Sequence, residues 1–275
     1  MGVTSAGRLV DAYDLVILDL DGVVFLIDRP IPGAVETLGR LRADGVPVMF
    51  ATNNASRRAG EVADLLSGMG VAATAAEVLT SAGAAAATLA SRFAANEPIL
   101  VIGADALRDE VRDAGLRLVD SADDKPVAVV QGYGPDVGWR QLAEASLAIR
   151  AGALWVATNT DRTLPSPRGP LPGNGSLVSV IATALDRRPD VVIGKPEPGL
   201  FEAAAQLTGA RRPLVVGDRL DTDIAGARRA DVDSLLVLTG VSSRADLEQT
   251  PPELRPTYVA DDLTGLFAVT SGTER

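Results

Sequence analysis

The sequence contains neither cysteine nor histidine among its 275 residues. The lack of cysteine excludes disulfides and thiol nucleophiles. The lack of histidine excludes histidine general bases, phosphohistidine intermediates and imidazole metal ligands. The remaining chemistry uses carboxylate, hydroxyl, amide and amine groups, which suit hard, oxygen-preferring cations such as Mg²⁺.

The sequence also has few aromatic residues, a negative net charge and no long apolar run. Aromatics make up 4% of the chain, so the core must be aliphatic, and the formal net charge of -10 disfavours a general nucleic-acid binder. No run reaches the ~18 apolar residues of a membrane span, and residues 1–12 lack the apolar core of a signal peptide. We therefore expect a cytoplasmic protein with no nucleic-acid or membrane partner. Because an acidic surface repels anions, any phosphate site must be locally positive.

Short apolar runs alternate with helical segments along the chain, which is typical of an α/β protein. Glycines and prolines crowd into residues 165–175, which predicts a long loop. The expected strands are 15–20, 46–52, 99–103, 127–131, 154–158, 191–193, 214–217 and 234–238. The expected helices include 33–43, 57–68, 81–94, 139–151, 175–185, 199–208 and 221–230.

Two aspartates and a glycine follow the first apolar run directly. Side chains two residues apart on a strand share a face, so Asp19 and Asp21 start on the same side, and Gly22 lets the chain turn away. Ligands of open α/β sheets bind beyond the carboxyl ends of strands. Because two like charges so close need a cation or a shared proton, the pair predicts half of a magnesium and phosphate site. A polar strand end with a glycine turn is the alternative. An EF-hand loop is excluded, since its fifth and twelfth positions would be Val23 and Pro30.

Polar groups also follow two later strands. Thr52, Asn53 and Asn54 either bind phosphate oxygens or cap the helix expected from residue 57. Lys195 is either a phosphate-directed amine or a solvated surface charge. It does not belong to a P-loop, because Pro196 stands where Ser or Thr is required.

A fourth strand, 214–217, is followed by Asp218, Asp221 and Asp223. Acids at a helix N-terminus complement the helix dipole, and Asp221 fits that interpretation well. Asp218 fits it less well, because it is the first residue beyond the strand glycine.

Together these signals place two acids, Thr and Asn, Lys and further acids at four strand ends, in that order. The order resembles the haloacid dehalogenase-like phosphatases, whose motifs are D-x-D-G, a Ser or Thr, a Lys and G-D-x-x-x-[TD]-D. Thr-Asn-Asn at 52–54, Gly-Lys-Pro-Glu-Pro at 194–198 and the long insert between them resemble subclass IIA, the p-nitrophenyl phosphatase-like branch. The resemblance spans nearly the whole chain and includes Leu-Thr-Gly-Val at 238–241 and the segment 255–259.

The resemblance implies a role for each acid. Asp19 would be the nucleophile that forms an aspartyl-phosphate, and Asp21 would protonate the leaving oxygen and then deprotonate the hydrolytic water. Mg²⁺ would lie between the Asp19 carboxylate, the Asp21 main-chain carbonyl, Asp218, the phosphate and waters. Asp223 would support Lys195 or a metal-bound water without touching the metal itself.

The resemblance also implies the groups that hold the phosphate. Thr52 and the group at Asn53 would bind phosphoryl oxygens, with Asn54 as a further contact on the same side. Lys195 would neutralise the charge that develops in phosphoryl transfer.

The family's architecture implies a Rossmann-like, doubly wound parallel core, formed by residues 1–80 and 191–275, with an inserted α/β C2-type cap of residues 81–190. The segment 155–173 resembles the substrate-facing part of such caps, so Asn159, Asp161 and Arg162 are candidate substrate contacts. Loop capping by Asn and Asp is an equally good interpretation of the first two. Many relatives dimerise through the cap, so the resemblance also implies a homodimer through the cap as an option.

Two residues of the expected cap depart from the family's pattern. Thr160 stands where Pro is common, and the segment Gly-Tyr-Gly at 132–134 carries Gly where Asp is often seen. Both departures concern specificity rather than the phosphate chemistry.

Three other functions compete with hydrolysis. In a receiver-type signalling domain, the phosphorylated Asp follows a later strand than the acid pair, whereas here the next strand ends in Thr52. The large insert disfavours a phosphomutase, and the complete motif set disfavours a non-catalytic phosphate-binding protein.

We expect a Mg²⁺-dependent phosphatase of a small phosphorylated metabolite. The net charge of -10 and the acids of the site favour glycerol 3-phosphate over substrates with an extra carboxylate. Phosphoglycolate, pyridoxal phosphate and nucleoside monophosphates are the alternatives within the branch.

Overall fold

The computed structural model describes residues 7–27 and 29–270. The contacts between Cα atoms divide the chain into two compact units. Unit 1 comprises Met1–Ala51, Leu65–Ala73 and Phe201–Arg275, and unit 2 comprises Thr52–Asp64 and Thr74–Leu200. Both units contain parallel sheets covered by helices, so the predicted α/β class with a Rossmann-like core is confirmed.

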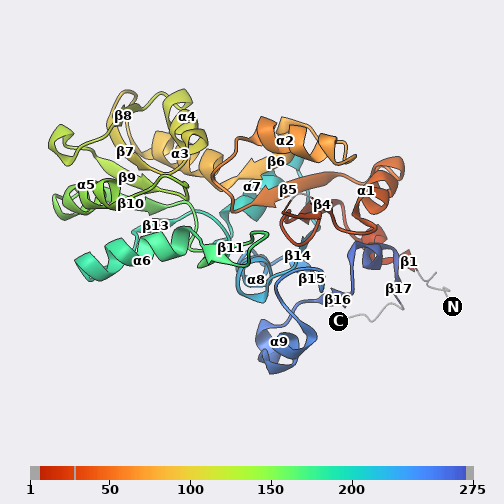
Figure 1. Ribbon diagram of the computed structural model, residues 1–275. Coiled ribbons are helices and arrows are strands. Elements are labelled where there is room, and N and C mark those ends of the chain that lie inside the picture. The colour runs from red at the N-terminus through yellow and green to blue at the C-terminus, as the bar shows by residue number, and fades with distance from the viewer. Residues whose placement is uncertain (1–6, 28, 271–275) are drawn as a thin grey trace. The chain divides into compact units, whose positions relative to one another are not determined.

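The sheet of unit 1 places the first apolar run in its interior, between β14 and β5. Its strands run in the order β16-β15-β14-β2-β5, and the pairings between them are parallel (Figure 1). Every side chain of β2 is fully buried, because helices cover both faces of such a sheet, and its sequence is therefore continuously apolar. The bounds are β2 (Leu15–Leu18), β5 (Val48–Thr52), β14 (Pro213–Gly217), β15 (Asp233–Val237) and β16 (Tyr258–Ala260).

Helices and short strand pairs complete the segments around this sheet. The predicted helix 221–230 is in fact a π-helical turn, Leu220–Ile224, followed by the short helix α8 (Ala225–Arg229). The other helices are α1 (Ala34–Ala43), α2 (Ala59–Gly68), α7 (Gly199–Thr208) and α9 (Arg244–Gln249). The antiparallel pairs are β1 (Gly7–Arg8) with β17 (Val269–Thr270) and β3 (Phe25–Leu26) with β4 (Arg29–Pro30).

Unit 2 has a five-stranded parallel sheet of order β13-β10-β9-β7-β8. Side chains of a strand alternate between faces, so Ile99 and Val101 pack with α3 and α4, whereas Leu100 and Ile102 pack with α5 and α6. Figure 1 shows these two pairs of helices on opposite faces of the sheet. The strands are β7 (Pro98–Ile102), β8 (Arg117–Val119), β9 (Ala128–Gln131), β10 (Leu154–Ala157) and β13 (Val191–Val192). The helices are α3 (Ser81–Arg92), α4 (Asp105–Asp113), α5 (Trp139–Arg150) and α6 (Asn174–Leu185), and the short strand β6 (Val78–Thr80) precedes α3.

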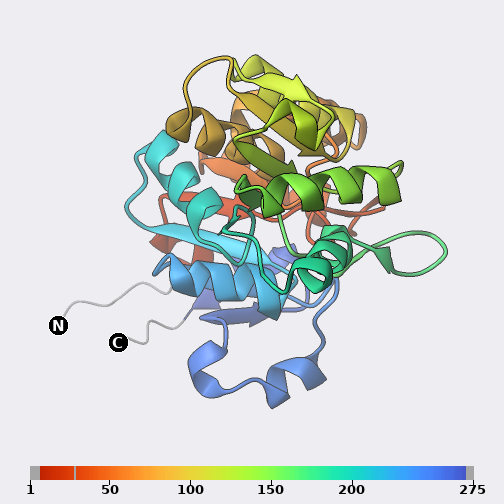
Figure 2. The ribbon, with the colours of Figure 1, turned by 90° about the vertical axis from the view of Figure 1, so that its left-hand side faces the viewer.

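Apart from the helix 221–230, each predicted strand and helix is present, with ends that differ by a few residues. The predicted loop 165–175 is more ordered than expected, because β11 (Thr163–Leu164) pairs with β12 (Leu171–Pro172) in a hairpin that Figure 2 shows as an extended loop of unit 2. The expected cap, 81–190, falls inside unit 2, while its boundaries stay a prediction. Within the described ranges, no helix combines the length and apolar character that a bilayer crossing requires.

Candidate functional site

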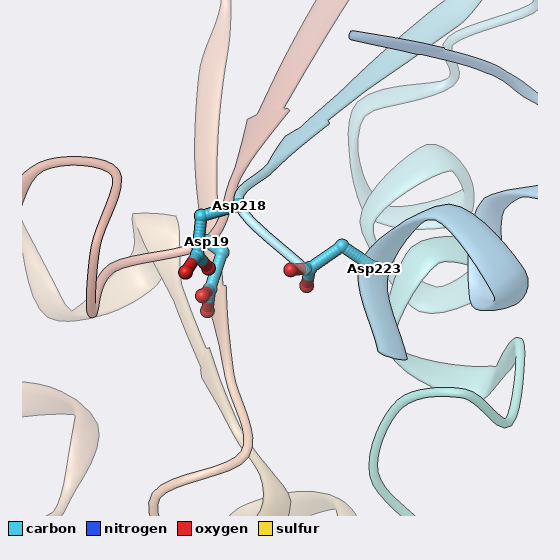
Figure 3. Close-up of side chains that lie close together, drawn as sticks. All are labelled: Asp19, Asp218 and Asp223. Carbon is cyan, nitrogen blue, oxygen red and sulfur yellow. The ribbon is translucent and has the colours of Figure 1, made fainter. Parts of the chain in front are cut away.

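Three carboxylates converge at the carboxyl ends of two neighbouring strands of unit 1. Asp19 follows β2 and Asp218 follows β14, and these strands pair in parallel through Leu18 and Val216. The π-helical turn brings Asp223 to the same place, so that ligand oxygens of the three acids lie within 4.8 Å of one another (Figure 3). All three acids are buried, at 8% exposure or less. Like charges gathered away from water require a cation or bound protons.

The Asp218 carboxylate is surrounded closely by main chain. The N–H of Val241 donates to Asp218 Oδ2 at 2.6 Å, and the N–H of Ser242 donates to the main-chain carbonyl of Asp218 at 3.0 Å. A Cβ atom on Gly240 would lie 2.0 Å from the same Oδ2, and one on Gly22 would lie 2.6 Å from it. Neither glycine therefore has room for a side chain. Gly22 also has a φ of +83°, a conformation that favours glycine.

Asp223 and Asp221 differ sharply in their surroundings. Asp223 is fully buried, and its Oδ2 accepts the main-chain N–H of Arg219 at 3.1 Å. A Cβ on Gly217 would lie 2.1 Å from the Cβ of Asp223, so this glycine permits the close approach. Asp221 is exposed and pairs with the Arg219 guanidinium at 2.9 Å. Asp221 is therefore a surface acid, as its position at a helix start predicted, whereas Asp223 belongs to the acid cluster.

Asp21 lies in the turn just beyond Asp19 and is half-buried. The turn is fixed by the N–H of Gly22, which donates to the Phe25 carbonyl at 2.7 Å, and by the Thr239 hydroxyl, which donates to the Gly22 carbonyl at 2.6 Å. Thr239 thus holds the turn after Asp19, and Val241 holds the Asp218 carboxylate, both from a segment that follows β15. From sequence this segment carried a family resemblance but no assigned role.

A second polar cluster forms within unit 2 around Asn53. The Asn53 carboxamide bonds to the main chain of Lys195 and to the carboxylate of Asp161. Asn159 donates to the Asn53 carbonyl at 2.7 Å and accepts the N–H of Asp161 at 3.1 Å. Four of the predicted site residues, from three separate segments of the sequence, therefore meet here. Lys195 is only 2% exposed, so the interpretation of a solvated surface charge is wrong.

The remaining predicted residues of unit 2 lie in local turns. The Thr52 hydroxyl, which is buried, accepts the N–H of Asn54 at 3.1 Å. The Asn54 side chain accepts the N–H of Ser56 at 2.8 Å and its hydroxyl at 2.7 Å, so it makes the kind of local turn that the capping interpretation anticipated. The Arg162 side chain is exposed at the base of the β11–β12 hairpin.

Two family models match the chain. The family described as haloacid dehalogenase-like hydrolase matches residues 16–117, and the one described as HAD-hydrolase-like matches residues 192–266. The D-glycerol 3-phosphate phosphatase of Mycobacterium tuberculosis is 49% identical over 258 residues, which cover 94% of this chain and 72% of that protein. These matches span both units.

Solved structures give the same assignment. The crystal structure of glycerol phosphate phosphatase from Mycobacterium tuberculosis in complex with magnesium superposes with a TM-score of 0.90 at 49% identity, over 95% of this chain and 79% of that one. The 4-nitrophenylphosphatase from Thermotoga maritima superposes with a TM-score of 0.88 at 32% identity, over 96% of this chain and 100% of that one. The predicted resemblance to subclass IIA is confirmed by these neighbours.

Proposed function

Because the chain belongs to the haloacid dehalogenase-like hydrolases, we propose that it hydrolyses small phosphomonoesters with Asp19 as the nucleophile. The observation that supports this most is the buried cluster of Asp19, Asp218 and Asp223 at the carboxyl ends of β2 and β14. This is the edge of an open α/β sheet at which ligands bind. The reaction class and the role of each residue are those that the family's motifs imply, and the acid cluster supports them.

The three carboxylates fit Mg²⁺. They offer only oxygen ligands, which this ion prefers, and the main chain of Gly22 and Gly240 approaches Asp218 so closely that a side chain at either position would collide with it. Asp19 and Asp218, with the main chain of Asp21, would hold the ion, and Asp223 would support them from the π-helical turn. When bound, Mg²⁺ supplies the positive charge that lets a carboxylate approach an anionic phosphate.

The protein's own groups divide the reaction into two steps. The Asp19 carboxylate oxygen forms a bond to phosphorus while the bond to the leaving oxygen breaks, and Asp21 gives that oxygen a proton. Asp21 then takes a proton from water, whose oxygen attacks phosphorus and releases Asp19 and inorganic phosphate. Thr52 and Asn53 bind phosphoryl oxygens, and the Lys195 amine neutralises their charge.

Glycerol 3-phosphate is the proposed substrate. The Mycobacterium tuberculosis relative that is 49% identical carries that activity in its name. The overall charge of -10 also opposes substrates with an additional carboxylate. The expected cap, 81–190, supplies the groups that distinguish one leaving group from another, with Asn159, Asp161 and Arg162 as the candidates, because the motif residues recognise only what all phosphomonoesters share.

The cytoplasm is the proposed location.

A homodimer through the expected cap is the proposed assembly. The observation that supports the dimer is a set of large apolar side chains on α5 and α6, two adjacent helices of unit 2. Trp139 is 79% exposed, Leu147 55% and Val180 50%. Burial of such side chains would remove apolar surface from water. Light scattering on wild type and Trp139→Arg should give a dimer and a monomer. Leu207→Arg, at an exposed position of α7, is the matched control, and a monomeric wild type would contradict the assembly.

Turnover of phosphorylated metabolites tests the function. Purified protein is incubated with glycerol 3-phosphate, phosphoglycolate, pyridoxal phosphate and a nucleoside monophosphate, with Mg²⁺ or with excess chelator. We expect phosphate release only with Mg²⁺ and fastest from glycerol 3-phosphate. Full activity in chelator would contradict the metal assignment, and release from none of the four would contradict the substrate class.

A further inference from the structure

The Asn53 carboxamide bonds to both the main-chain N–H and the main-chain carbonyl of Lys195. The Lys195 N–H donates to Asn53 Oδ1 at 2.8 Å, and Asn53 Nδ2 donates to the Lys195 carbonyl at 2.9 Å. This pair of hydrogen bonds is what a neighbouring residue of a β-ladder provides. It fixes both the position and the orientation of the Lys195 backbone, from which the amine extends.

The same carboxamide also holds Asp161. Asn53 Nδ2 lies 3.2 Å from Asp161 Oδ1 and 3.1 Å from its Oδ2. A carboxamide nitrogen carries two hydrogens, so one can serve the Lys195 carbonyl and the other the carboxylate. Both hydrogens therefore have acceptors inside the protein, and the carboxamide keeps no donor for a phosphoryl oxygen. Any contact of Asn53 with phosphate then comes from its main chain.

The Asn53 carbonyl joins two further segments to this point. It accepts the Ser81 hydroxyl at 2.6 Å, where α3 begins, and the Asn159 side chain at 2.7 Å, just beyond β10. Ser81, Asn159 and Asn53 itself are all buried. Buried hydrogen bonds of this kind are costly to leave unmade, because their partners are then stranded away from water.

Gly194 makes the close approach sterically feasible. A Cβ at this position would lie 2.4 Å from Asn53 Oδ1 and 2.8 Å from the Thr158 carbonyl. The residue before Lys195 must therefore be glycine for reasons of space. The glycine of the Gly-Lys-Pro segment thus has a specific partner, the Asn53 side chain.

We infer that Asn53 is a positioning residue that holds the phosphate-directed Lys195 and the substrate-directed Asp161 in one fixed register. The inference rests on the proposed function for the roles of those two residues, whereas the bonding itself does not. A displaced amine loses part of its contribution to charge neutralisation, so kcat should fall more than KM rises. Misplacement of a group by about 1 Å can cost as much as ~10²-fold in rate.

Asn53→Asp tests the role with almost no change in volume. It replaces both N–H donors by an oxygen and sets it against the Asp161 carboxylate and the Lys195 carbonyl. We expect kcat with p-nitrophenyl phosphate to fall by about 10- to 100-fold, with a lower midpoint of thermal unfolding. Asn96→Asp, at an exposed position of unit 2, adds the same charge and should leave both quantities unchanged.

Adding Asp161→Asn to Asn53→Asp exchanges donor and acceptor within the pair. The carboxamide at position 161 can then donate to the carboxylate at position 53, so the double variant should recover at least about threefold in kcat over Asn53→Asp. Asp161→Asn alone should not raise kcat. Wild-type kinetics in a folded Asn53→Asp protein, or no recovery in the double variant, would overturn the inference.

The thermal midpoints of the same four proteins form an independent cycle. If wild type releases no phosphate, the proposed function fails, and the cycle alone decides the inference. A double variant that is more stable than the sum of the two single shifts predicts supports the pairing of positions 53 and 161. Strictly additive shifts overturn it.

Discussion

The main-chain N–H of Val241 donates to the buried Asp218 carboxylate at 2.6 Å. Asp218 follows β14, and Val241 follows β15, so the bond joins the ends of two adjacent strands. Gly240, the residue before Val241, also approaches this carboxylate, because a Cβ on it would lie 2.0 Å from Asp218 Oδ2. The main chain at Gly240 and Val241 therefore helps to set the orientation of a predicted metal ligand.

Gly240→Ala should impair the acid cluster without touching any carboxylate. The added methyl group displaces Asp218, and we expect kcat/KM at limiting Mg²⁺ to fall by about 10²-fold, with partial recovery at high Mg²⁺. Activity is titrated against Mg²⁺ for each protein. Gly39→Ala, in α1, meets no atom within 4 Å and is the matched control. Equal Mg²⁺ dependence in wild type and Gly240→Ala would contradict the account.

Asp21→Asn should separate the two half-reactions. General acid–base assistance is worth about 10²–10⁴-fold, and p-nitrophenolate leaves with little need for a proton. Rapid-quench bursts should therefore show a larger loss of the first step with glycerol 3-phosphate than with p-nitrophenyl phosphate. If both esters lose the first step equally, Asp21 is not the acid.

The acids of the site could be predicted from sequence because each follows an apolar strand, and parallel strands end at one edge. The positions of Asp19 and Asp218 follow from the ends of β2 and β14, which pair in parallel. The placement of Asp223 could not be derived so simply, since it depends on a π-helical turn where an ordinary helix was expected. The family pattern supplied its role, and the structure supplies its position.

The bonding of Asn53 could not be predicted from local patterns. Its partners Asp161 and Lys195 lie 108 and 142 residues away, and the direction of a side-chain amide depends on tertiary packing. The hairpin of β11 and β12 could not be predicted either, because its two-residue strands are too short to show an alternation of apolar and polar residues. Strand ends thus predict which residues gather, and only the structure shows which of them bond to each other.

Substitutions at Asp161 and Arg162 should change substrate preference. Wild type is expected to favour glycerol 3-phosphate over phosphoglycolate. Asp161→Ala removes a negative charge and should shift the ratio of kcat/KM towards phosphoglycolate by roughly fivefold, the equivalent of about 1 kcal/mol at a partly exposed site. Arg162→Ala should shift it the other way. The ratio cancels any loss common to both substrates.

Arg188→Ala, at an exposed position between α6 and β13, is the control for this ratio. A ratio left unchanged by both substitutions would remove Asp161 and Arg162 from the proposed substrate contacts. A wild-type preference for phosphoglycolate would contradict the proposed substrate.

Asp14 should make stability depend on pH. The main-chain N–H of Arg211 donates to Asp14 Oδ2 at 2.8 Å and that of Arg212 to Oδ1 at 2.9 Å, and these bonds lower the pKa of the Asp14 carboxyl. Because the folded pKa is below the unfolded value of about 3.9, the stabilisation is present above that value and is lost as pH falls through the folded pKa. Asp14→Asn should lower the thermal midpoint at pH 7 and have less effect at about pH 3. An equal effect at both pH values would count against this.

Turnover by Asp19→Asn tests the central claim, covalent catalysis by Asp19, most directly. The substitution keeps nearly the same volume but removes the nucleophile, so the variant should fold with a thermal midpoint close to or above that of wild type. With saturating Mg²⁺, phosphate release from glycerol 3-phosphate should fall to the background of a no-enzyme control, whereas Asp136→Asn, the same change in an exposed loop, should match wild type. A folded Asp19→Asn protein that retains substantial turnover would contradict the account.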